Sequence, residues 1–270
     1  MPINISSVRN NYNQSFEQGS IKQKSNEKNN NNQQKLKPAV TAASALGVGI
    51  AYALIAKKQG FSITPSKILK TPIKDWSLIK LYDKNHPERK LIKIEEWEIL
   101  GLAGGSIAGG LTAGAIVDNK KNFKAKIREA INQFIGNVCI PVAFVKGVSV
   151  LYDKNKRQIL SKVPQISGDG KVIKSINKGL KCIPSAAMTL VALGAGIVTG
   201  NKFSNFINEE VFHKKVERHI KKTDFAPHVD DIGMAVSLMA DKSKVSTAIT
   251  NTVPFFLCVP GIQTGTAQDK

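Results

Sequence analysis

Apolar stretches without a single charged residue alternate along the chain with segments dense in lysine and arginine. The stretches 38–56, 99–117 and 183–200 contain no Asp, Glu, Lys or Arg. About 20 helical residues are needed to cross a hydrocarbon core roughly 30 Å thick, so each stretch is long enough for one crossing. The pattern predicts membrane helices over 38–56, 98–117 and 183–200.

Two further windows are apolar but interrupted. Residues 134–152 contain one charge, Lys146, and residues 245–267 are uncharged but contain Pro254 and Pro260. Proline removes a backbone donor and disrupts a helix interior. The first window predicts a fourth helix. The second predicts a fifth segment that spans the bilayer, re-enters it or lies at its surface.

Together these windows predict an all-α integral membrane protein with four or five transmembrane helices rich in Gly and Ala. The multi-pass membrane domain covers 38–267 and includes a basic loop at 57–96 and a charged helix at 203–222. The Asn/Gln/Lys-rich stretch 1–37 has few large apolar residues and cannot bury enough surface to offset its ordering entropy. We expect this stretch to be a disordered N-terminal tail.

The formal net charge of +19 bears on the partners of the chain. Lys and Arg are spread over nearly every polar segment, and aromatic residues for stacking on bases are few, so nucleic acid is not an expected partner. Anionic headgroups of a lipid bilayer are the expected partner, in a membrane that the sequence does not identify. The loops on alternate sides carry nearly equal numbers of Lys and Arg, so the positive-inside rule sets no orientation.

Small residues recur at a spacing of four within the apolar stretches. Gly101, Gly105 and Gly109 follow this spacing in one window, and Gly196 and Gly200 follow it in another. Residues four apart lie on one face of a helix, and glycine there lets a second backbone approach closely. We expect these glycines to be helix-packing positions. The spacing does not distinguish packing within one chain from packing in a homo-oligomer.

Each of the three cysteines stands two residues before a proline, at Pro141, Pro184 and Pro260. The pattern fits a rule of backbone geometry, a degenerate internal duplication, or a three-cysteine site for Cu(I) or Zn(II). No cysteine has a second Cys or a His within its own turn, and proline commonly starts or bends a helix, so we favour geometry. The predicted helix starts or kinks are Pro141, Pro184, Pro254 and Pro260.

Two other features suggest chemistry. Lys146 is a candidate intramembrane charge that pairs with a carboxylate or lines a wet cavity, unless its window is shorter and the side chain reaches the interface. Glu210, His213 and Glu217 share one helical face, and Glu-x-x-His is half of a di-iron carboxylate motif. A solvated face with Glu–Lys pairs explains the same residues more simply.

No nucleophile elbow, phosphate loop or His-Glu-x-x-His motif occurs in the sequence. We therefore expect no enzymatic activity, no cofactor and no metal site. The leading hypothesis is a membrane-embedded structural protein, or one that self-associates through its small-residue helix faces. The alternative is a small transporter or channel, and the second alternative is a peripheral metal-binding protein.

Overall fold

The architecture is seen in a computed structural model, in which all regular structure of the described residues is helical. The predicted all-α class is confirmed for this part of the chain. Most of the tail and of the basic loop, together with Glu217 and Pro254, lie outside it. The structure describes residues 34–60, 66, 96–214, 218–229, 232 and 255–269.

Among the described residues, four helical stretches are long and apolar enough to cross a membrane, and each contains one of the first four predicted windows. They are Gln34–Lys58, α3 (Glu96–Val117), the continuous stretch Lys120–Ser161 and α6 (Lys171–Glu210). The third stretch changes its helical type along its length, because a π-helix interrupts it. Its parts are η2 (Lys120–Asn122), α4 (Phe123–Ile131), the π-helix η3 (Asn132–Cys139) and α5 (Ile140–Ser161).

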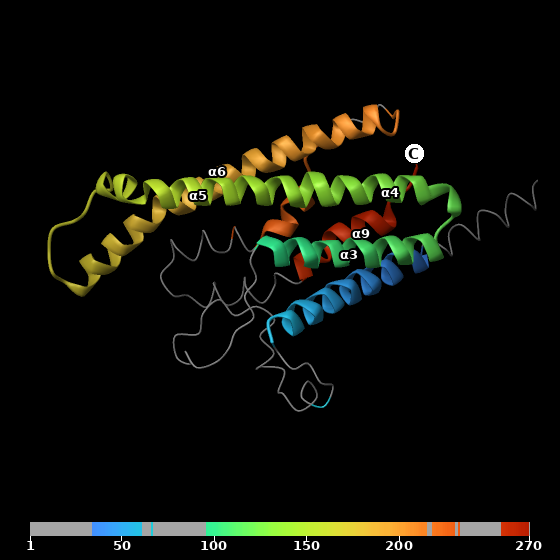
Figure 1. Cartoon of the computed structure of the whole chain (residues 1–270), viewed down its shortest axis with the longest axis horizontal. Helices are drawn as coiled ribbons and strands as arrows, with labels where there is room; N and C mark the ends of the chain where they lie inside the picture. Colours follow the sequence, from blue (N-terminus) through green and yellow to red (C-terminus); the bar gives the residue numbers. More distant parts are fainter. Residues whose placement is uncertain are drawn as a thin grey trace, which may run out of the picture.

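Successive candidate spans, called crossings below, run antiparallel, as Figure 1 shows. A Cβ placed on Gly105 would lie 2.5 Å from the carbonyl oxygen of Gly47, and one placed on Gly109 would lie 2.8 Å from the carbonyl carbon of Ala43. The first helix, Gln34–Lys58, therefore packs along α3 in the antiparallel direction. We call the end of the bundle near the turn 118–119 the α3–α4 end, and the end near the loop 162–170 the α5–α6 end.

The structure describes only the second part of the predicted fifth segment, 245–267. Within the window 245–267, the described part contains one turn of helix at 255–257 and then α9 (Val259–Thr266), which has eight residues. At 1.5 Å per residue α9 is only about 12 Å long, less than half of a hydrocarbon core. Pro260 lies in the first turn of α9, where its missing N–H costs nothing, so the proline starts a short helix here.

The predicted charged helix at 203–222 differs from the structure after Glu210. α6 continues to Glu210 and then ends, and His213 adopts a left-handed conformation with φ of 51°. A left-handed residue closes many helices, because it turns the chain so that the last carbonyls find donors. Here Lys214 N donates to the Asn208 carbonyl at 2.9 Å. The chain then folds back as the 3₁₀-helix η4 (Lys222–His228).

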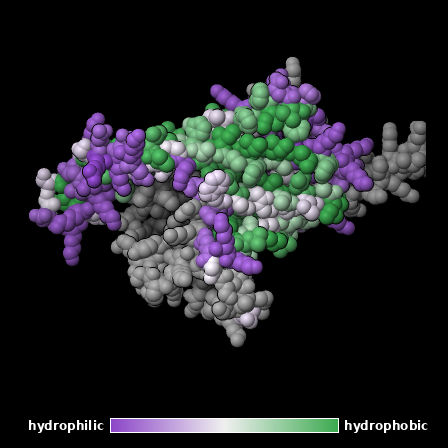
Figure 2. Space-filling model, in the orientation of Figure 1, coloured by the Kyte–Doolittle hydropathy of each residue, from purple (hydrophilic) through white to green (hydrophobic). Residues whose placement is uncertain are grey.

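Apolar side chains cover the outside of the bundle between two polar ends (Figure 2). On the first helix, Leu46, Ile50 and Leu54 point outward, and each is at least 62% exposed. Large apolar side chains exposed in this number cost free energy in water but none in lipid. The long third and fourth stretches, at 42 and 40 residues, extend past this apolar belt into a polar hairpin at the α5–α6 end.

Candidate functional site

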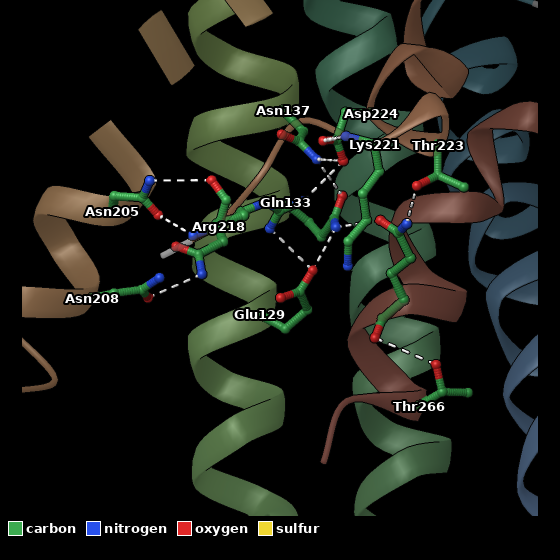
Figure 3. Close-up of polar contacts among 12 residues, drawn as sticks. Glu129, Gln133, Asn137, Asn205, Asn208, Arg218, Lys221, Thr223, Asp224 and Thr266 are labelled. Carbon is green, nitrogen blue, oxygen red and sulfur yellow. Dashed lines mark hydrogen bonds and ion pairs between the residues drawn. The ribbon is translucent and has the colours of Figure 1, made fainter. Parts of the chain in front are cut away.

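A cluster of charged and amide side chains lies inside the bundle, where α4, η3 and η4 meet (Figure 3). We call it the polar centre and define it as Glu129 of α4, Gln133 and Asn137 of η3, Arg218, and Asp224 of η4. All except Glu129 are buried, and the Glu129 side chain is 26% exposed. The polar centre is thus built from the third crossing and from the segment that folds back after α6.

Arg218 joins the two carboxylates of the polar centre. Its Nη1 lies 3.1 Å from Glu129 Oε1, and its Nη2 lies 2.9 Å from Asp224 Oδ1. One guanidinium balances only one carboxylate, so these three side chains carry a net charge of −1 when all are ionised. A buried charge without compensation is expensive, and this excess negative charge is the main electrostatic feature of the site.

The two amides of η3 extend the ion pairs into a chain of hydrogen bonds. Gln133 Nε2 donates to Glu129 Oε1 at 2.6 Å, and Asn137 Nδ2 donates both to Gln133 Oε1 at 3.0 Å and to Asp224 Oδ1 at 2.9 Å. Glu129, Gln133 and Asn137 are spaced four apart and so share one face of the third crossing. The wide π-helical turn that carries the two amides is a type found often at functional sites.

Pro141 explains why a histidine reaches this part of η3. In an α-helix the Asn137 carbonyl would accept from the N–H of residue 141, which proline lacks. His228 Nε2 lies 2.7 Å from that carbonyl oxygen, and the imidazole is fully buried. A carbonyl can only accept, so Nε2 must carry the proton. The final residue of η4 therefore docks on the proline break of the third crossing.

α6 fixes the backbone at Arg218. Asn205 accepts from Arg218 N at 2.7 Å and donates to the Arg218 carbonyl at 3.2 Å, and Asn201 donates to the same carbonyl at 2.8 Å. One helical turn further along α6, Asn208 accepts from Asn132 Nδ2 at 3.1 Å. These asparagines lie on one face of α6, and they hold the returning segment so that its guanidinium points into the bundle.

α9 closes the other side of the polar centre. Gln263 accepts from Gln133 in a short side-chain contact and donates to Thr223 at 2.6 Å. Two glycine pairs bring α9 against α3: a Cβ on Gly110 would lie 2.9 Å from Gly261 Cα, and the corresponding distance between Gly114 and Gly265 would be 2.8 Å. Real Cβ atoms essentially never approach so closely, so only glycine fits at these positions.

Lys126 holds the C-terminal end of α9. Its fully buried ammonium donates to the carbonyls of Gly265 and Ala267 at 2.7 and 2.9 Å, and it lies 2.7 Å from Asp118 Oδ2. A cation at a helix C-terminus satisfies carbonyls that have no intrahelical donor. Burial alone would raise the pKa of Asp118, but hydrogen bonds from Lys126 and neighbouring donors outweigh it and hold that pKa below its usual value.

Several buried polar atoms at and beside the polar centre have no partner among the residues that the structure describes. Asn137 Oδ1 and Arg218 Nε belong to the polar centre itself. The others lie beside it, where η3 faces α6. These neighbouring atoms are Asn132 Oδ1, Asn201 Oδ1 and Ser204 Oγ.

The glycines singled out in the sequence lie in helix contacts within the chain. Gly105 and Gly109 face the first helix at close range, whereas the Cβ position of Gly101 is 3.8 Å from the Ile55 side chain. On α6, Gly196 lies against Pro141 and Gly200 lies against Gly136 of η3. The two stripes therefore serve two different interfaces inside the bundle.

The remaining predicted site residues lie away from the polar centre. Lys146 forms an ion pair with Glu96 at 2.9 Å, with side chains 56% and 32% exposed, at the α5–α6 end of α3. Pro141 stands in the first turn of α5, and Pro184 lies inside α6. Glu210 and His213 are exposed, and within the described ranges no three potential ligands come together to hold a metal.

The sequence offered only a weak signal for the polar centre. Asn132, Gln133 and Asn137 are polar residues at helical spacing at the start of an apolar window, which is unusual for a lipid-facing helix. Arg218 is one of several basic residues in a charged segment, and nothing local marks it as the one that folds inward. Lys126 is hidden in the same way among the lysines of α4.

The chain matches no protein-family model, no curated protein and no solved structure. The contacts of the polar centre are therefore the basis on which a function can be proposed.

Proposed function

We propose that the protein is a small membrane transporter or channel whose translocated solute passes through the polar centre. The observation that carries this proposal is that the returning C-terminal segment brings charged groups into a bundle of helices that are apolar enough to span lipid. Ionisable residues at such depth are expensive, and in membrane proteins they mark solute and ion pathways.

The depth of the polar centre supports this proposal. Phe134, next to Gln133, lies against Gly104, near the middle of the charge-free part of α3. From the other side Gln263, which contacts Gln133, lies two residues after Gly261, itself packed on Gly110. The polar centre is therefore level with the middle of α3 rather than with either end.

The course of the backbone supports it as well. After α6 ends at the α3–α4 end, the chain returns to His228 beside Asn137, and α9 later leads back to Lys126 at that same end. Short helices and irregular backbone at membrane depth are tolerated only where protein or water surrounds them, and broken helices of this kind form the solute sites of many transporters. α9 is such a half-length helix.

Reconstitution into proteoliposomes tests the proposal. Vesicles with the purified protein should pass at least one small ion or polar solute faster than empty vesicles, and Asp224→Asn should lower that flux by at least tenfold because it changes the charge of the site while keeping its shape. Asp153→Asn removes a carboxylate from an exposed position on α5 and should leave flux unchanged. Flux equal to that of empty vesicles across a broad panel would refute the proposal.

A structural, self-associating protein is the second candidate because Gly49 of the first helix faces outward between two alanines. Within the described part of the chain, nothing lies within 4 Å of a Cβ placed on Gly49, and Ala45 and Ala53 flank it at the same helical spacing. Gly49→Leu should then shift the oligomer distribution in detergent toward monomer. Gly105→Leu is unsuited to this test, since Gly105 packs against Gly47 of the same chain.

A further inference from the structure

We propose that the polar centre binds one small monovalent cation of the Na⁺ or K⁺ class, next to Asn137 Oδ1. This inference takes its biological meaning from the proposed transport function, but the binding itself can be measured without transport. Three observations on the polar centre lead to it: its charge, the unpartnered amide oxygen of Asn137 and the partial exposure of one carboxylate.

The net charge of the polar centre indicates the sign and the valence of the ion. Glu129 and Asp224 share the single guanidinium of Arg218, so one negative charge is left over. The nearby ammonium of Lys126 does not compensate it, because Lys126 is already paired with Asp118. One monovalent cation brings the sum to zero, whereas a divalent cation would leave a positive excess of the same size.

The unpartnered atoms define the ligand chemistry. Asn137 is 1% exposed, and its amide nitrogen is bonded to Gln133 and Asp224, so its side chain points into the polar centre (Figure 3). Its Oδ1 accepts no hydrogen bond from any described residue. Amide and carboxylate oxygens are the ligands that hard cations prefer. The five residues of the polar centre include no Cys and no His, the ligands that softer metals prefer.

The route to the site runs along Glu129. Its side chain is 26% exposed, in contrast to the other members of the polar centre, and α4 leads from it to the exposed lysines at the α3–α4 end. On the opposite side, the apolar cluster that includes Leu102, Val138 and Leu257 separates the polar centre from the α5–α6 end. A cation would therefore enter from the α3–α4 end.

The experiment compares thermal unfolding of the purified protein in detergent with NaCl, KCl or choline chloride at equal ionic strength. A bound ion stabilises only the folded state, so Na⁺ or K⁺ should raise Tm saturably, by about 5 °C at 100 times Kd, relative to choline. Line broadening of the ²³Na resonance, reversed by KCl, gives an independent readout of binding. A larger effect of either ion supports the inference and identifies the preferred one.

Two variants connect this effect to the polar centre. Asn137→Leu removes the unpartnered oxygen, and Glu129→Gln removes the excess charge at a partly exposed position where folding is expected to survive. Both should abolish the difference between Na⁺ or K⁺ and choline, whereas Asp153→Asn should retain it. Equal Tm values in the three salts, or an ion effect that persists in Glu129→Gln, would overturn the inference and leave the space near Asn137 Oδ1 to water. Binding without flux would instead refute only the proposed transport.

Discussion

The hydrogen bond between His228 and the Asn137 carbonyl predicts that His228 and Pro141 are energetically coupled. His228→Ala leaves a buried carbonyl without its donor, which costs about 1–3 kcal/mol, and it also creates a cavity. Pro141→Ala restores an N–H that can bond to the same carbonyl. In the double variant the Asn137 carbonyl again has a donor, while the cavity remains. The free energies of the two changes should therefore be coupled by about 1–2 kcal/mol. The double variant should be more stable than the sum of the two single effects predicts.

Unfolding of the four proteins in mixed micelles, followed by circular dichroism, measures this coupling. The cavity contributes equally in both backgrounds and cancels from the double-mutant cycle. Pro184→Ala is the matched control, because it restores an N–H inside α6, whereas His228 bonds to the Asn137 carbonyl of η3. Free energies that add within about 0.5 kcal/mol for His228 and Pro141 would refute the idea that the histidine replaces the missing donor.

Three further outcomes follow from the glycine contacts and from Lys126, the α4 residue that holds the end of α9. Gly105→Leu should destabilise the bundle by about 1–3 kcal/mol or more through overlap with the first helix, measured by unfolding in detergent, while Gly194→Leu, at a site with open space, should change it little. Lys126→Met should release the C-terminal end of α9 and speed its digestion by carboxypeptidase. Because the pKa of Asp118 is lower in the folded state, its ion pair with Lys126 should stabilise the protein above the unfolded aspartate pKa, and this stabilisation should be lost as the pH falls through the folded pKa. Asp118→Asn should remove this dependence of Tm on acidic pH. A pH profile of Tm identical to that of the wild type would contradict the prediction.

The four candidate spans among the described residues were predictable because a helix that crosses lipid must be free of charge at its centre. The actual helix lengths were not, because the rule stops at the membrane surface. α6 begins at Lys171 and extends to Glu210, beyond the charge-free stretch 183–200 at both ends, since charged residues form good helices once they are in water.

The polar centre could not be predicted for a different reason. Its members come from positions as far apart as Glu129 and Asp224, and no periodic pattern connects them. The prolines of the window 245–267 left open whether it spans, re-enters or lies at the surface, and they could not show that α9 packs on α3 through glycine pairs. Contacts between distant segments depend on the complete packing of the bundle, which local propensity does not encode.

The hairpin of α5 and α6 has a practical consequence for studying the protein in cells. α6 is 40 residues long, and its residues 171–182, before the charge-free stretch 183–200, add about 18 Å of helix at 1.5 Å per residue. In a membrane this part of α6 and the loop 162–170 would therefore project beyond the hydrocarbon core on one face. An epitope inserted at the loop 162–170 would be reached by antibody or protease from that compartment only. Such labelling would establish which way the protein is oriented in the membrane. The nearly equal numbers of Lys and Arg in the loops on alternate sides do not decide this orientation.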